Sequence, residues 1–257
     1  MNQPQTLNLE KVGQALLVTL ARPEARNALD VTMMSELRSL WGSLPADVRC
    51  IVITGDGPGF CAGADMSLLE SDRDDAAASA AEELSFLPGA HVDVPVIAAV
   101  NGVCAGGGLH FVADADIAIA SAEATFIDPH VSVGQVTALE PLTLRLRMRS
   151  DVLARMVLLG RHERLDAERA LAAGLVSETV DPGDLRARAL QLAAQIAANS
   201  PAAVRRSRAV LRDFEHELLE RHLERGWDGI RAHWDHPDAK EGPQAFVERR
   251  QPNWRAD

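Results

Sequence analysis

Three consecutive glycines, Gly106 to Gly108, separate two apolar runs, and His110 follows them after one leucine. The pattern predicts a strand that ends near Val100 and a helix that begins near Gly107 or Gly108. The first amides of a helix have no partner within the helix, and the helix dipole adds positive potential there. Glycine lets a ligand approach that backbone closely. The run therefore predicts either an anion or oxyanion site, or only a tight turn packed against a neighbour.

A second stretch of similar character, FCAGADM (residues 60–66), lies earlier in the chain, after a predicted strand and turn. Two separate backbone amides directed at one carbonyl oxygen form an oxyanion hole. The sequence does not match the glycine motifs of nucleotide-binding proteins. Gly55, Gly57 and Gly59 give only G-x-G-x-G, and no phosphate-loop pattern occurs. The two glycine-containing turns therefore favour stabilisation of an oxyanion over binding of a nucleotide.

Short apolar runs alternate with helical patterns over roughly the first 180 residues, which is typical of an α/β protein with parallel strands. From about Asp184 onward the chain is predicted to be helical, with arginine and glutamate on the outer faces. The predicted strands are residues 15–20, 50–54, 95–100, 116–120 and 124–127. The predicted helices are residues 31–41 with Asp30 as N-cap, 72–84, 109–113, 185–198, 202–213 and 214–234.

Composition excludes several classes of function. The chain has 257 residues and a formal net charge of −11, which argues against general binding to nucleic acid or anionic membranes. Its 3 cysteines do not suggest a disulfide framework, and no His/Cys spacing suggests a metal site. The first ten residues lack the pattern of a signal peptide, and no apolar stretch is long enough to span a bilayer. We expect a cytoplasmic protein with one main domain and an extension.

Six stretches carry a resemblance to a known family. They are RPEARNALD (22–30), GPGFCAGAD (57–65), PVIAAVNGVCAGGG (95–108), ADIAIASAEATF (115–126), ALAAGLV (170–176) and KEGPQAFVERR (240–250). With them the chain resembles the enoyl-CoA hydratase/isomerase family, also called the crotonase family. Each stretch alone is a weak signal, but together they follow the family order over nearly the whole chain.

The resemblance implies an α/β fold: a spiral of strand-strand-helix repeats followed by a C-terminal helical region that trimerises. It places the spiral core at residues 1–195 and the helical region at residues 196–257. Trimers of the family often pair into hexamers, so we expect a homotrimer or a dimer of trimers. The implied substrate is an acyl-CoA thioester. Coenzyme A then enters as part of the substrate, and no other cofactor and no metal is expected.

The resemblance also implies roles for particular residues. The amides of Ala64 and Gly107 match the oxyanion-hole positions, where they would hold the thioester oxygen as it becomes an enolate. The positions that match the path of coenzyme A are Ala25, Arg26, Ala62, Phe246 and Arg250. For Arg26 and Arg250 an ordinary solvated arginine is an equal alternative, and Asp65 is interpreted as a helix cap.

The chain departs from the family at the two acid/base positions. Typical hydratases carry glutamates there, whereas this sequence has His110 and His130. A histidine suits proton transfer at neutral pH, but it cannot copy the grip of a carboxylate on a water molecule. Glu140 lies ten residues after His130, and a carboxylate near an imidazole raises its basicity. Asp128 and Glu123 are interpreted as structural.

Three hypotheses about function remain open. The first is an acyl-CoA hydratase or isomerase that uses His110 and His130 for proton transfer. The second is a hydrolase of a carbon–carbon bond in a β-diketone or β-keto thioester, similar to 6-oxocamphor hydrolase, in which His130 and Glu140 activate water. The third is a non-catalytic protein that binds acyl-CoA.

Overall fold

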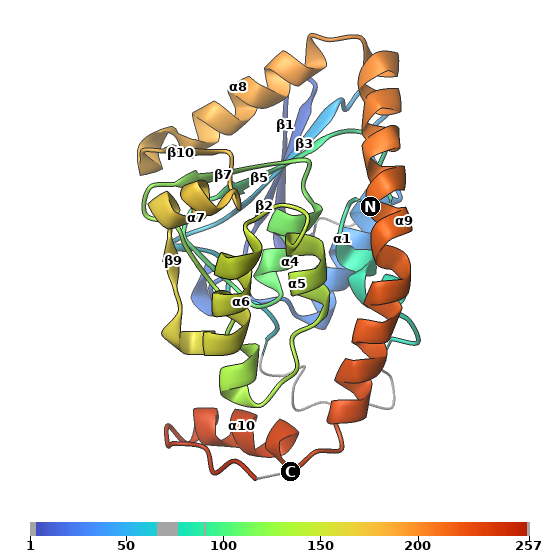
Figure 1. Cartoon of the computed structure of the whole chain (residues 1–257). Coiled ribbons are helices and arrows are strands. Elements are labelled where there is room, and N and C mark those ends of the chain that lie inside the picture. Colours follow the sequence, from blue (N-terminus) through green and yellow to red (C-terminus); the bar gives the residue numbers. More distant parts are fainter. Residues whose placement is uncertain (1–3, 66–76, 90, 256–257) are drawn as a thin grey trace.

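The computed structural model describes residues 4–65, 77–89 and 91–255 (Figure 1). The strands are β1 (Leu7–Val12), β2 (Ala15–Leu20), β3 (Cys50–Gly55), β4 (Gly59–Cys61), β5 (Val96–Val100), β6 (Val103–Ala105), β7 (Ile117–Ser121), β8 (Thr125–Ile127), β9 (Leu165–Asp166) and β10 (Glu178–Val180). The α-helices are α1 (Val31–Trp41), α3 (Ala80–Glu83), α4 (Gly108–Asp114), α5 (Leu139–Leu144), α6 (Ser150–Leu159), α7 (Ala167–Ala173), α8 (Leu185–Ala197), α9 (Pro201–His233) and α10 (Asp238–Val247). Short 3-10 turns include η1 (Pro23–Ala25), η3 (Leu84–Phe86) and η4 (His130–Val133).

The strands form two sheets. One has the order β1-β2-β3-β5-β7-β10 and the other the order β4-β6-β8-β9. Consecutive strands alternate between the sheets, since β3, β5 and β7 belong to the first and β4, β6 and β8 to the second. Among the strand pairs of the described residues, β1–β2 and β8–β9 are antiparallel and the others are parallel. This alternation is the predicted spiral of strand-strand-helix repeats.

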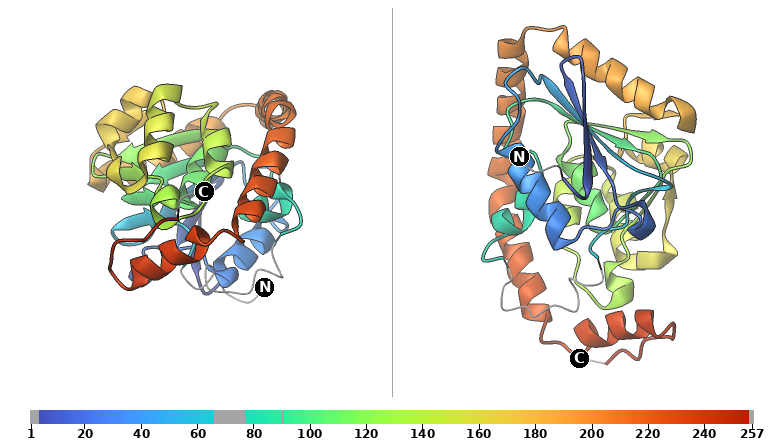
Figure 2. Two further views of the ribbon diagram at one scale, coloured as in Figure 1. Left: turned by 60° about the horizontal axis from the view of Figure 1, so that its bottom comes forward. Right: turned by 180° about the vertical axis from the view of Figure 1, so that it is seen from behind.

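The first sheet is buried on both faces, which explains why its inner strands are almost continuous apolar runs. On one face, Val52 and Ile97 pack with Ala189 and Ala193 of α8. On the other face lies the larger core, in which strand residues meet α1 and α4. α8 contacts β2, β3, β5 and β7 and so lies across the first of these two faces of the sheet (Figures 1 and 2). The α/β interpretation is therefore confirmed.

Most of the predicted elements are confirmed. Strands occur at all five predicted places, and Asp30 caps α1 by accepting a hydrogen bond of 2.7 Å from the amide of Met33. The strand β1 was not predicted, because this edge strand exposes most of its side chains and lacks an apolar run. Within the predicted helix 72–84, residues 72–76 lie outside the described residues, and α3 covers only Ala80–Glu83.

The C-terminal helices differ from the prediction. Residues 202–213 and 214–234 do not form two helices but one, α9, which spans 33 residues. No glycine or proline interrupts the chain near residue 213, and Ser200 caps the N-terminus, so nothing breaks the helix there. The boundary expected between residues 195 and 196 falls inside α8, and the division at that point stays a prediction.

Two arginines of α9 attach this long helix to the body. Arg208 is 7% exposed, and its Nε donates to both carboxylate oxygens of Asp116, at 3.0 and 2.8 Å. Arg212 donates to the carbonyl oxygen of Asp114, the last residue of α4. Figures 1 and 2 show α9 running along one side of the molecule. These contacts hold α9 against the C-terminal end of α4, the helix that begins at the three glycines.

Candidate active site

The backbone amides of Ala64 and Gly107 lie near each other, where the turn at Gly63 packs against the turn at Gly106. A Cβ atom placed on Gly107 would lie 3.7 Å from the amide nitrogen of Ala64, and one placed on Gly63 would lie 3.2 Å from the amide nitrogen of Gly107. Within the described part of the chain, neither amide donates a backbone hydrogen bond. Ala64 is exposed and Gly107 half-buried, so a ligand can reach both. The two amides therefore lie close to each other, and neither is used by the described part of the backbone.

Positive backbone φ angles make this approach possible. Gly63 has φ of +94° and Gly106 has φ of +48°, a region that side-chain-bearing residues rarely adopt. The turn before α4 thus depends on glycine at Gly106, while Gly107 itself has φ of −54° and needs glycine only for space. The glycine run therefore provides both the left-handed turn at Gly106 and the close approach at Gly107.

The imidazole of His130 lies beside the same turn. A Cβ atom on Gly106 would lie 3.4 Å from Cε1 and 3.7 Å from Nε2 of His130. His130 opens η4, and its side chain is 25% exposed. The ring thus lies against the turn that leads into α4.

Asp128 orients this ring. Its Oδ1 lies 2.6 Å from Nδ1 of His130 and also accepts a hydrogen bond of 3.2 Å from the backbone amide of His130. The other oxygen accepts 2.8 Å from Thr137 Oγ1. Asp128 is 1% exposed, so its carboxylate has a fixed position. Asp128, interpreted from the sequence as structural, is therefore a direct partner of the His130 ring, and its place two residues before His130 was the available signal.

Glu140 lies between the two histidines. It is a buried residue of α5, and its Oε1 is 3.1 Å from Nε2 of His110 and 3.7 Å from Nε2 of His130. α5 packs on α4, which carries His110. Glu140 therefore reaches His130, which the sequence left open, but it faces Nε2, whereas Asp128 holds Nδ1.

Neighbouring charges shift the pKa values of His130 and Glu140. Burial favours the neutral form of His130, but the carboxylates of Glu140 and Asp128 outweigh it and raise the pKa of His130 to about 9. Burial likewise opposes ionisation of Glu140, yet the two imidazoles outweigh it and lower the pKa of Glu140 well below its ordinary value. At neutral pH, His130 is therefore an imidazolium beside a carboxylate.

His110 is the more deeply placed histidine. Its side chain is 8% exposed, and Phe86 packs edge-on against it with ring centroids 6.2 Å apart. No described group hydrogen-bonds to its buried Nδ1. His110 also lines a cavity of about 670 Å³ whose walls include Leu84 of η3 and Leu223 of α9. A buried nitrogen without a partner is costly, so His110 is held in this position at the expense of some stability.

The positions expected along the coenzyme A path fall into two groups. Ala25, Arg26 and Ala62 lie beside the amide pair, since the Ala62 amide donates 3.0 Å to the Arg26 carbonyl. Phe246, at the end of α10, is 61% exposed, and Arg250 pairs with Glu241. Among the described residues, the polar contacts of Arg250 are all to the C-terminal segment. α10 itself packs against η4, which begins at His130.

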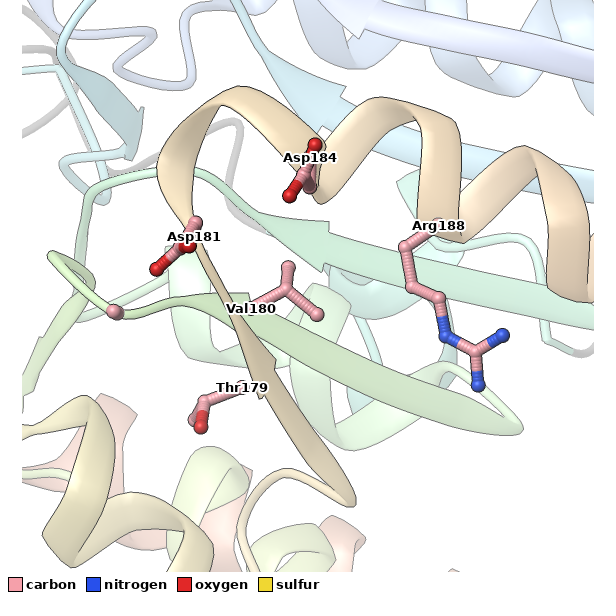
Figure 3. A pocket seen from close by; sticks show the side chains of 6 residues that line it. Thr179, Val180, Asp181, Asp184 and Arg188 are labelled. Atoms are coloured by element: carbon pink, nitrogen blue, oxygen red, sulfur yellow. The ribbon is translucent and has the colours of Figure 1, made fainter.

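A second cavity, of about 490 Å³, lies at β10 and the start of α8 (Figure 3). Its lining residues are Ala122, Thr179, Val180, Asp181, Asp184 and Arg188. The Arg188 guanidinium is already occupied by Glu178, with hydrogen bonds of 2.7 and 2.9 Å. None of the candidate residues lines this cavity. Across residues 4–65, 77–89 and 91–255, no cluster of three or more side chains suited to a metal occurs.

Comparisons with known proteins agree with this architecture. Residues 10–257 match the sequence model of the enoyl-CoA hydratase/isomerase family, and the chain belongs to that family. It is 36% identical to (E)-benzylidenesuccinyl-CoA hydratase of Thauera aromatica, over 97% of this chain and 98% of the relative. It is 33% identical to carnitinyl-CoA dehydratase of Proteus mirabilis, over 98% of each chain.

Solved structures give the same result. A carnitinyl-CoA hydratase from Mycobacterium avium superposes with a TM-score of 0.86 at 31% identity, covering 99% of this chain and all (100%) of that one. An enoyl-CoA hydratase/isomerase from Pseudoalteromonas atlantica gives a TM-score of 0.89 at 28% identity, covering 98% and 100%. The chain is therefore an enzyme of the crotonase family that acts on acyl-CoA thioesters. In the described part of the chain, no helix could cross a membrane.

Proposed function

We propose that this enzyme adds water across the C2–C3 double bond of an enoyl-CoA thioester, or removes it in reverse. The observation that carries the proposal is the imidazole of His130 beside two unoccupied backbone amides. Relatives named as a hydratase and a dehydratase support this reaction over isomerisation. No cofactor is needed beyond the coenzyme A that the substrate carries.

The amides of Ala64 and Gly107 form the oxyanion hole. Attack at C3 moves charge onto the thioester oxygen, and two fixed N–H donors stabilise that charge without reorganising. The same amides make little difference to the neutral carbonyl of the ground state. They therefore lower the barrier rather than only increasing affinity.

His130 is the acid and His110 is the base. Water bonds to C3 and gives a proton to Nδ1 of His110, while the π electrons of the double bond move into the enolate. His130 then donates its Nε2 proton to C2, and the carbonyl re-forms. Oε1 of Glu140, which lies near both Nε2 atoms, offers a path for the proton to return from His110 to His130.

The remaining candidates bind the two ends of the substrate. Arg26 is exposed beside the amide pair, where its positive charge suits the phosphates of coenzyme A. Ala25 and Ala62 leave space for the pantetheine arm. Phe246 of α10 and Arg250, three residues beyond the helix, contact coenzyme A. The cavity at His110 has a volume within the range of ligand pockets, but of the proposed catalytic and oxyanion residues only His110 lines it.

The hydrolase hypothesis needs His130 as a general base toward water. An imidazolium has no acceptor nitrogen, so the raised pKa of His130 disfavours that role at neutral pH. The same charge suits an acid that protonates C2. Hydration is therefore the preferred reaction.

We also propose that the enzyme is a cytoplasmic homotrimer or a dimer of trimers. Four apolar side chains of α9 are exposed, namely Val210 (69%), Leu211 (66%), Phe214 (61%) and Leu218 (44%). Exposed apolar stripes of this kind mark protein–protein contacts. Sedimentation should show a trimer or larger for the wild type and smaller species for Phe214→Glu. Leu158→Glu, an equally exposed apolar position on α6, is the control; a monomeric wild type would contradict the proposal.

The pH dependence of hydration tests the role of His130. Because His130 must be protonated, activity is expected to be retained at neutral pH and to fall as the pH rises through about 9. In Glu140→Gln the carboxylate that raises this pKa is lost, so the alkaline fall should move to lower pH. Rates with crotonyl-CoA, followed by loss of the enoyl absorbance, measure both profiles.

Glu178→Gln, which removes a carboxylate paired with Arg188, is the control and should leave the profile unchanged. An alkaline fall that stays at the same pH in Glu140→Gln would contradict the assignment.

A further inference from the structure

We propose that Arg22 is a positioning residue for the oxyanion hole: by holding Asp65 and Asp30 together it fixes the direction of the Ala64 amide. The inference rests on the proposed function, since it assigns a task to a residue outside the reacting groups. Arg22 lies in the loop before α1, more than forty positions before Asp65 (the hydrogen bond between them spans 43 residues). Nothing in the chemistry proposed above uses its charge.

The guanidinium of Arg22 joins three groups. Nη1 donates 3.0 Å to Oδ2 of Asp65 and 2.6 Å to the carbonyl oxygen of Ala28. Nε lies 3.2 Å from Oδ2 of Asp30, the residue that caps α1. The side chain is only 20% exposed, so these contacts are partly shielded from water. The planar fork of arginine can hold all three partners in one geometry, which an ammonium group cannot do.

These contacts bracket Ala64. The amide of Leu29 donates 2.8 Å to the Gly63 carbonyl, and the amide of Asp65 donates 2.8 Å to the Leu29 carbonyl. The residues on both sides of Ala64 are thus tied to the Arg22 loop, while the Ala64 amide stays free. Arg22 closes this unit by tying the Asp65 side chain to the same loop. Fixing both neighbours restricts rotation of the peptide that carries the Ala64 N–H.

The loop is held in an unfavourable conformation. Arg26 and Asn27 are consecutive non-glycine residues with φ of +52° and +56°. Asn27 is fully buried, and its amide group donates 2.9 Å to the carbonyls of Asp56 and Gly59. The backbone amide of Arg22 donates 2.9 Å to Asn27 Oδ1, so Arg22 closes this turn as well. Strain of this kind persists where the surroundings fix it, often next to a functional site.

Charge gives a second reason for arginine at this position. Asp65 is bonded directly to Ala64, and Asp30 shares the same guanidinium. Two uncompensated carboxylates here would oppose negative charge on the substrate oxygen. The cation of Arg22 balances them without contacting the substrate.

The test compares Arg22→Met, Arg22→Lys and Asp65→Asn with the wild type. The measurements are kcat and KM for hydration, and the enolate absorbance of bound acetoacetyl-CoA, which reports polarisation of the thioester without turnover. Arg22→Met is expected to lower kcat by about 10- to 100-fold, less than loss of a whole donor, with little change in KM. It should also weaken the enolate band. Arg22→Lys should recover part of both losses.

Arg188→Met is the matched control. It removes a partly exposed arginine of α8 that pairs with a single acid, Glu178 of β10. Its kcat and enolate band should stay unchanged. Asp65→Asn keeps the shape of the side chain and provides the test if Arg22→Met does not fold.

The outcomes separate this inference from the proposed function. The role of Arg22 would be overturned if folded Arg22→Met and Asp65→Asn kept the wild-type kcat and enolate band, or if only KM rose. Either result would leave the proposed hydration intact. The opposite result is also distinguishable. If the wild type does not hydrate enoyl-CoA but forms an enolate band that is lost in Arg22→Met, hydration is overturned and the role of Arg22 is supported.

Discussion

Replacing His130 by glutamine is expected to lower kcat for hydration by about 100- to 10,000-fold, the usual contribution of a general acid or base. Glutamine keeps a polar side chain of similar reach, but it cannot carry a proton to C2. The measurement is the initial rate of loss of enoyl absorbance under saturating substrate. The rate should fall while binding of the substrate changes little, because the proton moves only in the transition state.

His222→Gln is the control for this replacement, because His222 is exposed on α9 and lines neither of the two cavities described above. Circular dichroism and thermal unfolding should show that both variants are folded. A folded His130→Gln that keeps most of the wild-type kcat would exclude His130 as the proton donor.

Replacing Gly107 by alanine is expected to lower kcat/KM by about 100- to 1,000-fold, as for loss of an oxyanion donor. The backbone φ of −54° suits alanine, so the turn should remain folded. The added methyl group would lie 3.7 Å from the Ala64 amide nitrogen and 3.4 Å from Cδ1 of Leu29. It would therefore occupy the space between the two amides that the thioester oxygen needs.

Gly183→Ala is the matched control, since a Cβ atom there meets nothing within 4 Å and no left-handed φ is involved. Its kinetics should equal those of the wild type. If Gly107→Ala retains near wild-type kcat/KM, the carbonyl does not bind between these amides.

The sequence could predict the parts of the site that depend on local backbone. Strand, glycine turn and helix follow each other within a few residues near Gly107, so the free amides could be expected from local patterns. The strands of the first sheet were also predictable, because burial on both faces leaves apolar runs. The family resemblance supplied the partner amide at Ala64.

Contacts between distant segments could not be predicted in the same way. The shared position of Glu140 between His110 and His130 depends on how α5 packs on α4. The same holds for Arg22 and Asp65, whose hydrogen bond spans 43 residues. No local pattern specifies such a pair, because each side chain taken alone is compatible with a solvated surface position.

The helix α9 shows that local sequence patterns also did not predict the full length of a regular helix. Two helices were predicted to meet at residues 213 and 214, although Val210, Leu211, Phe214 and Leu218 continue at helical spacing across that point. Ion pairs of Arg208 with Asp116 and of Arg212 with Asp114 hold the single helix against the body. Ser200 caps its N-terminus, and these tertiary contacts support its length.

The most direct test of the proposed chemistry is product analysis in deuterium oxide. Wild-type enzyme is incubated with 2-enoyl-CoA thioesters that carry short, branched and aromatic acyl groups, and the products are examined by mass spectrometry and NMR. Hydration through His110 and His130 predicts, for at least one substrate, a 3-hydroxyacyl-CoA with one deuterium at C2. Folded enzyme that leaves every enoyl thioester unchanged, or that cleaves a carbon–carbon bond instead, would contradict it.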